Sequence, residues 1–156
     1  RAKLEEKRKI LDLYTGIGSI PFYLAEDGRY IRGVESSESS VSDALYNLQK
    51  SAPKGKIKFT AGKVRPFLSK CEEFYDAVVL DPPRGGISCR VFKHINRIAK
   101  RTDEPVKVIY VSCSIKNFIS DAEYIRNELG WHMQSLTGVD QFVHTPHLET
   151  VAEFEI

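Results

Sequence analysis

The chain has 156 residues, of which 42% are hydrophobic and 28% are charged, and this balance excludes disordered, collagen-like and membrane-spanning proteins. Its 23 basic and 21 acidic residues leave a net charge of +2, which is too small to predict nucleic-acid binding from charge alone. No stretch reaches the roughly 18 consecutive apolar residues of a membrane-spanning helix, and the first residues lack the layout of a signal peptide. We therefore expect one domain over residues 1–156, cytoplasmic and without a membrane partner.

The three cysteines, Cys71, Cys89 and Cys113, are odd in number and lack the close spacing of metal ligands. The sequence therefore predicts reduced thiols and no metal site, with structural roles for Cys71 and Cys89. The chain begins at Arg1 without an initiator Met, so we expect it to be a piece of a longer protein. These features predict no particular oligomeric state.

Short runs rich in branched and aromatic residues recur along the chain and predict strands. They cover residues 10–14, 30–34, 57–60, 75–80 and 106–112. Between them, apolar residues spaced three and four apart predict amphipathic helices over residues 41–48, 91–99 and 118–129. Two further runs, 131–138 and 151–156, have no helix between them, which predicts a closing pair of antiparallel strands.

Alternation of strands and helices favours right-handed crossovers and a mostly parallel sheet covered on both faces. Residues 77–80 and 108–111 are apolar almost without alternation, as strands buried on both faces are. The sequence therefore predicts an α/β protein with a doubly wound, mostly parallel sheet and an antiparallel C-terminal strand pair. Ligands of such open sheets bind at the carboxyl ends of the strands, so the residues there are the candidates for function.

Gly16 and Gly18 follow the first predicted strand, where glycine lets the backbone turn sharply and approach a ligand. Glu35 follows the second strand, where an acid commonly accepts hydrogen bonds from ribose hydroxyls. Position 21 is a proline, whereas a pyrophosphate-binding turn requires a third glycine there. These features favour a cofactor that contains adenosine and no phosphate, with a plain strand-to-helix turn as the alternative.

The fourth predicted strand ends at Asp81-Pro82-Pro83-Arg84. The two prolines predict a rigid, non-helical corner that presents the acid and the arginine at the edge of the sheet. The next strand ends at Cys113. A lone cysteine near a strand is commonly buried and inert, but its place at a strand end near Asp81 makes Cys113 a candidate nucleophile.

His144, His147 and Glu149 lie near the C-terminus and are residue types that bind metals. Their spacing straddles Pro146 and cannot form the single helical face of a zinc-protease motif, so we expect no metal there. Glu149 begins the last strand, where partial burial would suit it to act as a general base.

These segments, in this order, resemble the catalytic domain of the RNA uracil-5-methyltransferases, which make 5-methyluridine in transfer and ribosomal RNA. The resemblance extends from Leu11 to Ile156, and its most specific parts are Asp81-Pro82-Pro83-Arg84, Ser112-Cys113 and His147-Leu148-Glu149. It implies a Rossmann-like methyltransferase fold, S-adenosylmethionine as the cofactor and a tRNA or rRNA as the partner.

The resemblance also implies roles for individual residues. Glu35 would bind the ribose of the cofactor, and the rest of its pocket would comprise Tyr14, Gly16, Gly18, Ser19 and Asp81. Cys113 would attack carbon 6 of uracil so that carbon 5 can accept a methyl group, and Glu149 would then remove the proton from carbon 5. Asp81 would stand between cofactor and base as a further catalytic residue. Arg84 and His147 would bind the RNA, whose target uridine must leave its stack.

The chain departs from the family pattern in several places. Ser114 and Ile115 replace the Asn-Pro that usually follows the nucleophile, and Gly62-Lys63 lacks the acidic or amide residue that commonly contacts adenine. Thr15, Asn117, Val143 and a longer loop around residues 101–105 also differ. The family's upstream RNA-binding module is missing, so we expect weak cofactor binding and poor methylation by these residues alone.

Two other functions fit parts of the sequence. Asp-Pro-Pro corners also occur in methyltransferases that act on exocyclic amino groups, although those usually have an aromatic residue where Arg84 stands. A catalytically drifted domain that serves as an RNA or protein scaffold would explain the substitutions around Cys113. The basic runs 54–58 and 93–101 are interpreted as solvated faces, with phosphate binding as the alternative.

Overall fold

The computed structural model describes residues 4, 6–140 and 148–156. All the strands and the three amphipathic helices that the sequence predicts are present. In chain order the elements are β1 (Lys9–Leu13), α1 (Ser19–Leu24), β2 (Tyr30–Glu35), α2 (Glu38–Ser51), β3 (Lys56–Ala61), α3 (Val64–Lys70), β4 (Ala77–Leu80), α4 (Cys89–Ala99), β5 (Lys107–Ser112), α5 (Ile115–Tyr124), the π-helical turn η1 (Ile125–Leu129), β6 (His132–Val139) and β7 (Glu149–Glu155).

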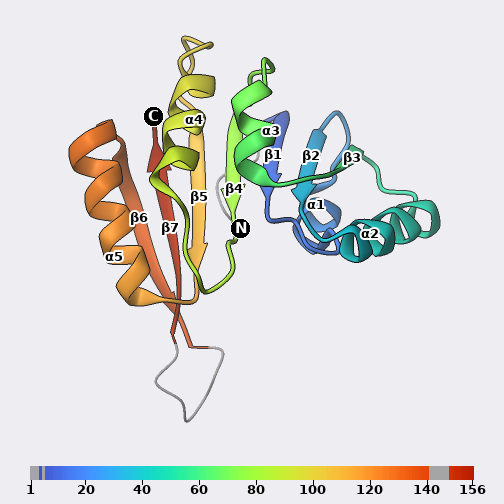
Figure 1. Cartoon of the computed structure of the whole chain (residues 1–156). Coiled ribbons are helices and arrows are strands. Elements are labelled where there is room, and N and C mark those ends of the chain that lie inside the picture. Colours follow the sequence, from blue (N-terminus) through green and yellow to red (C-terminus); the bar gives the residue numbers. More distant parts are fainter. Residues whose placement is uncertain (1–3, 5, 141–147) are drawn as a thin grey trace.

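The seven strands form one sheet in the order β3-β2-β1-β4-β5-β7-β6 (Figure 1). Strands β1 to β5 are parallel to one another, whereas β7 is antiparallel to both β5 and β6. The predicted mostly parallel sheet with an antiparallel C-terminal pair is thus confirmed. The strand order reverses beside β1, which is hydrogen-bonded to β2 on one side and to β4 on the other.

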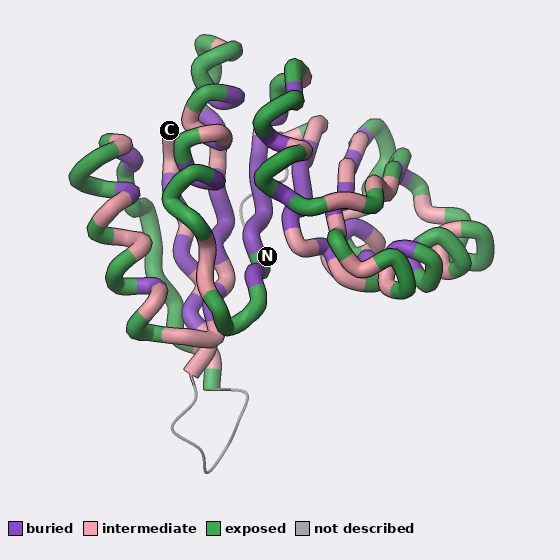
Figure 2. Tube along the Cα trace, in the orientation of Figure 1, coloured by how far each residue is buried: buried purple, intermediate pink, exposed green. Residues whose placement is uncertain are grey.

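Apolar side chains from alternate strand positions pack on the two faces of this sheet. One face is covered by α3, α4 and α5, whose buried residues include Leu68, Phe92 and Phe118. On the other face, Leu4 and α1 cover Ile10, Ile31 and Val79. The central strands are accordingly buried along most of their length (Figure 2). Burial of both faces explains the almost unbroken apolar sequence of β4 and β5.

Two short helices, α1 and α3, are not predicted by the spacing of apolar residues in the sequence. They have six and seven residues, which is too few for an apolar stripe to repeat. Pro21 and Pro66 lie in their first turns, where proline is tolerated because the backbone N–H has no acceptor within the helix. A loop connects α4 to β5 around residues 101–105, where the sequence predicts one.

Candidate active site

The residues that the sequence marks as candidates gather at one edge of the sheet. The parallel strands β1, β2, β4 and β5 all end there, and β7 begins there because it runs in the opposite direction. Each of these strand ends contributes one candidate. Glu35 is the last residue of β2 and Glu149 is the first residue of β7. The other three candidates directly follow the ends of β1, β4 and β5: Tyr14, Asp81 and Cys113. Five segments that are far apart in the sequence therefore supply a single site.

The register of β5 and β7 places Cys113 and Glu149 at the same end of this strand pair. Ser112 pairs with Thr150 in this antiparallel ladder, and Cys113 directly follows Ser112 while Glu149 directly precedes Thr150. Ser112 and Thr150 are buried, whereas Cys113 and Glu149 are both half-buried. Both residues therefore stand at the same end of the β5–β7 pair, at the carboxyl edge, and Cys113 is not enclosed in the core.

Asp81 completes this group from β4. Its side chain reaches solvent, but neighbouring atoms remove part of its hydration, and this desolvation raises the pKa of Asp81 above its ordinary value. The negative charge of Glu149 raises the pKa further. An electrostatic effect of this kind requires that the carboxyl groups of Asp81 and Glu149 lie near one another.

Asn117, in the helix that follows Cys113, is hydrogen-bonded to the Asp81-Pro82-Pro83-Arg84 corner. Its side-chain Nδ2 donates a hydrogen bond of 2.9 Å to the carbonyl oxygen of Arg84, while the Arg84 side chain is exposed. Gly86 turns beneath it with φ of +76°, and a Cβ there would lie 3.2 Å from Asn117 Nδ2. Sequence reasoning noted Asn117 only as a departure from the family, because its contact crosses 33 positions of the chain.

Glu35 ties the glycine turn after β1 to the loop after β2. Its Oε1 accepts hydrogen bonds from the backbone N–H groups of Ser36 and Ser37 at 2.6 and 2.8 Å, and its Oε2 accepts one from Gly16 N–H at 3.1 Å. Partial burial raises the pKa of Glu35, but the hydrogen bonds from Ser37, Gly16 and Ser36 outweigh it and hold the pKa below its ordinary value. Oε2 keeps room for a second donor.

Tyr14 and Gly18 shape the turn itself. Tyr14 has φ of +66°, a left-handed conformation that bulky residues rarely adopt and that concentrates at functional sites. Gly18 has φ of +89°, and a Cβ there would come within 2.6 Å of the Phe59 ring. Gly18 is therefore required both by the backbone and by packing against β3. Ser19 begins α1 and is exposed.

Asp12 lies buried beneath this turn, and sequence reasoning gave it no role. Thr15 Oγ1 donates a hydrogen bond to Asp12 Oδ2, but Asp12 Oδ1 has no partner in the described structure. Desolvation raises the pKa of Asp12 to about 7; the Thr15 hydrogen bond opposes this shift and the charge of Asp81 adds to it. A half-satisfied buried carboxyl at a glycine turn marks a place where a ligand group or proton is accommodated.

A hollow of about 450 Å³ opens among the loops at this edge. Tyr14, Ser36 and Ser88 line it from the ends of β1, β2 and the start of α4, and Lys63 and Arg65 line it from the start of α3. Its position beside the glycine turn and Glu35 makes it the candidate cofactor pocket. The sequence marks Lys63 only as part of Gly62-Lys63, which lacks the acidic or amide residue that commonly contacts adenine in the family.

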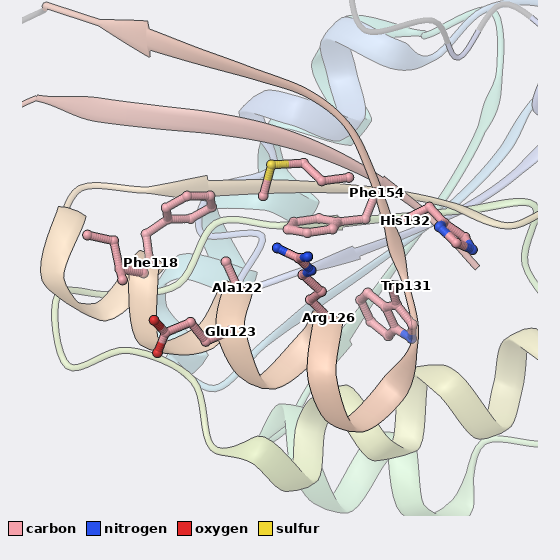
Figure 3. A pocket seen from close by; sticks show the side chains of 9 residues that line it. Phe118, Ala122, Glu123, Arg126, Trp131, His132 and Phe154 are labelled. Atoms are coloured by element: carbon pink, nitrogen blue, oxygen red, sulfur yellow. The ribbon is translucent and has the colours of Figure 1, made fainter.

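A second hollow, also of about 450 Å³, lies between α5, η1 and the β6–β7 pair (Figure 3). Its lining is mainly apolar and includes Phe118, Trp131 and Phe154, with Glu123 and Arg126 at its rim. None of the sequence-predicted site residues contributes to it. It is therefore separate from the candidate active site.

His147, the remaining candidate for RNA binding, and His144 lie outside the described residues. Within the described ranges, no three His, Cys, Asp or Glu side chains are grouped as metal ligands. In the same ranges, no helix combines the length and apolarity needed to cross a membrane.

A family model described as tRNA (Uracil-5-)-methyltransferase matches residues 1–154. The chain belongs to this family. Relatives include the tRNA (uracil(54)-C(5))-methyltransferase of Pyrococcus abyssi, 30% identical over 152 residues, and the 23S rRNA (uracil(1939)-C(5))-methyltransferase of Burkholderia thailandensis, 31% identical over 158 residues. Both matches cover 97% of this chain but only 34% and 33% of those relatives. The chain thus spans about a third of the length of these uracil-5-methyltransferases.

Solved structures agree with this membership. The crystal structure of the P. abyssi uracil-54 methyltransferase in complex with S-adenosyl-L-homocysteine matches with a TM-score of 0.75 and 29% identity, over 94% of this chain and 34% of that chain. Magnesium protoporphyrin IX methyltransferase from Synechocystis matches with a TM-score of 0.71 at 19% identity, over 95% and 69% of the two chains, which shows the fold alone. The expected Rossmann-like methyltransferase fold is confirmed.

Proposed function

We propose that the protein containing this chain transfers a methyl group from S-adenosylmethionine to carbon 5 of a uridine in tRNA or rRNA. The observation that supports the proposal is the β5–β7 register, in which Ser112 pairs with Thr150, so that Cys113 and Glu149 stand at the same end of the two strands, at the edge where Asp81 also lies. Amino-group methylation needs no thiol, whereas methylation at carbon 5 of uracil requires a nucleophile and a base near one another. The family membership of residues 1–154 supports the same reaction.

The residues at the glycine turn fit S-adenosylmethionine. Gly16 has open space where a Cβ would stand, and Glu35 Oε2 has capacity for a donor such as a ribose hydroxyl. We assign cofactor binding to Tyr14, Gly16, Gly18, Ser19, Glu35 and Asp81. The relative from P. abyssi was crystallised with S-adenosyl-L-homocysteine, the product that remains after methyl transfer. The bound cofactor supplies the methyl group as part of a sulfonium cation.

The chain's own residues then perform the covalent steps. The Cys113 thiolate forms a bond to carbon 6 of uracil, and the electron pair of the carbon 5–carbon 6 double bond moves toward the carbonyl at carbon 4, which makes carbon 5 nucleophilic. After carbon 5 has been methylated, Glu149 takes its proton and the pair from that C–H bond restores the double bond. The Sγ–carbon 6 bond breaks and the thiolate is released.

Asp81 and the proline corner hold the substrate side of the site. Desolvation and the charge of Glu149 both raise the pKa of Asp81, as is common for carboxyl groups at functional sites. Arg84 is exposed beside this corner, where its guanidinium is available to an RNA phosphate. We assign RNA binding to Arg84 and His147.

The deciding experiment uses RNA in which the target uridine is replaced by 5-fluorouridine. Fluorine cannot leave carbon 5 as a proton does, so the protein with Cys113 remains bonded to the RNA and survives a denaturing gel. Cys113→Ala eliminates this adduct and methylation of normal RNA. Cys89→Ala, which removes an exposed thiol elsewhere, retains both. Methylation that persists in Cys113→Ala would refute the covalent route and favour transfer to an exocyclic amino group.

A further inference from the structure

Helices α3 and α4 present a row of exposed basic side chains to solvent. We call this surface the basic face, and it comprises Arg65, Arg90, Lys93, Arg97 and Lys100. On α4 these residues recur at spacings of three and four, so they lie on the side of the helix opposite its buried residues Val91, Phe92, Ile95 and Ile98.

Acidic residues are missing from the same segments. Residues 44–71 and 82–102, which contain α3 and α4, include no Asp or Glu. The pKa of His94 is lowered by partial burial and then by the charges of Arg97 and Arg65. Charges from both helices therefore act at one point of this surface. The small net charge of the chain hides this uneven distribution.

Several basic residues in other parts of the described structure form salt bridges. Lys9 and Arg32 both form salt bridges with Glu73, at 3.0 and 2.8 Å, and Lys107 forms one with Glu153 at 2.7 Å. Across the described ranges, no salt bridge involves a residue of the basic face. Its positive charge is therefore available to an anionic partner.

Hydrogen bonds fix the two helices of the basic face to each other. The Arg97 guanidinium donates to the carbonyl oxygens of Leu68 and Cys71 at 2.7 and 3.2 Å, at the end of α3. Arg101 donates to the carbonyl oxygen of Glu72 in the following loop. The charges consequently have fixed relative positions, which lowers the entropic cost of binding a charged chain.

The basic face begins at the candidate active site. Ser88 and Val91 at the start of α4 line the hollow that Tyr14 also lines. From there α4 extends for 11 residues, or about 16 Å at the helical rise. A polyanion that enters the site at the carboxyl edge would meet one basic side chain in each turn of α4.

We propose that the basic face binds the phosphate backbone of the RNA strand that carries the target uridine. This inference rests on the proposed function and extends it to a surface outside the catalytic edge. The exposed large apolar residues found in the described structure lie on elements other than α3 and α4. Protein interfaces have an apolar core, whereas nucleic-acid interfaces are polar and strongly positive, so RNA fits this face better than a protein does.

The test measures the salt dependence of RNA binding. The full protein is titrated against a fluorescein-labelled RNA hairpin with uridine in its loop, and fluorescence anisotropy is recorded between about 50 and 200 mM salt. The test variant is Arg90→Gln/Lys93→Gln/Lys100→Gln. Arg65 lines the hollow and Arg97 links the helices, so neither is changed. The control variant Lys50→Gln/Lys54→Gln/Lys56→Gln removes the same charge from exposed positions on α2, β3 and the loop between them.

The test variant should reduce the slope of log affinity against log salt by about 2, since each lost phosphate contact contributes about 0.7 to 0.9. The control should keep the original slope, and so should Arg90→Lys/Lys93→Arg/Lys100→Arg. Equal slopes for the test variant and the original protein would overturn the proposal. Cofactor binding, measured by calorimetry, should be unchanged in all variants. Failure of the proposed function would give a different result: the test variant would still reduce the salt slope of RNA binding, but the original protein would not methylate uridine.

Discussion

Ser112 and Thr150 lie opposite one another in β5 and β7, and the Thr150 hydroxyl donates a hydrogen bond of 3.1 Å to the carbonyl oxygen of Ser112. Both residues are buried. They form the last buried pair before Cys113 and Glu149, so their contact sets how closely the proposed nucleophile and base approach one another.

Replacing Thr150 with Val keeps the shape of the side chain and removes this hydrogen bond. We expect the free energy of unfolding to fall by about 0.5–1.5 kcal/mol, measured by urea denaturation. We also expect a lower kcat for methylation with unchanged affinity for S-adenosylmethionine, because only the end of the β5–β7 pair is loosened. Thr137→Val on the exposed strand β6 is the control and should alter neither value. An unchanged kcat in Thr150→Val would show that this contact does not position the site.

Glu149→Gln separates the formation of the covalent adduct from its release. The variant should still bond to normal uridine-containing RNA through Cys113, but it should release the methylated product slowly because no base removes the carbon 5 proton. A denaturing gel should therefore show RNA bonded to the protein without any fluorinated base. Glu155→Gln, on the same strand, should show none. Rapid turnover by Glu149→Gln would assign the base to another residue.

The raised pKa of Asp12 predicts a specific dependence of stability on pH. Its pKa is about 7 in the folded chain against an ordinary value of 3.8, so folding takes up a proton between these values. The contribution of Asp12 to the free energy of unfolding therefore falls as the pH rises from about 4 to about 7 and stays low above that. Asp12→Asn removes this loss and should be more stable than the original at pH 8, by up to about 4 kcal/mol.

Urea denaturation of both proteins at about pH 5 and about pH 8 tests this expectation. The difference between the two proteins should grow with pH. Asp43→Asn, which changes an exposed carboxylate on α2, should leave the pH dependence of the original protein intact. Parallel stability curves for Asp12→Asn and the original protein would mean that Asp12 is ionised in the folded state.

Glu35→Gln should weaken cofactor binding. Glu35 accepts hydrogen bonds from Ser36, Ser37 and Gly16, and loss of its charge weakens these contacts as well as the proposed contact to ribose. Hydrogen bonds to charged groups contribute about 1.5–3 kcal/mol, so calorimetry should show affinity reduced about 10- to 100-fold. The neighbouring exposed carboxylate provides the control, Glu38→Gln. Equal affinities in the two variants would remove Glu35 from the cofactor site.

Local patterns in the sequence predict most of the fold. Apolar runs locate the strands, and apolar spacing locates α2, α4 and α5, because burial on a sheet imposes these periods. The helices α1 and α3 are too short for a stripe to repeat, and their prolines obscure them. The strand order around β7 is also not predicted, since it depends on which edges remain free after the parallel strands have paired.

Some residues of the candidate site could also be predicted from the sequence, whereas others could not. Glu35, Asp81 and Cys113 could be selected because they stand at strand ends, where parallel sheets bind ligands, whereas Tyr14 is implied only by the family resemblance. Contacts between distant segments carry no local signal. The hydrogen bond of Asn117 to Arg84 and the junction of basic residues on α3 and α4 therefore become visible only in three dimensions.

The placement of β7 between β5 and β6 affects how the protein matures on the ribosome. In a nascent chain that has been made only as far as β6, the edge of β5 is uncovered and β6 has no strand beside it, because β7 pairs with both. Glu149 takes its place at the end of the sheet that carries Cys113 only when β7 has been made and has paired with β5 and β6. In the proposed mechanism such a chain has the nucleophile without the base, so RNA that binds before β7 is made would not be methylated.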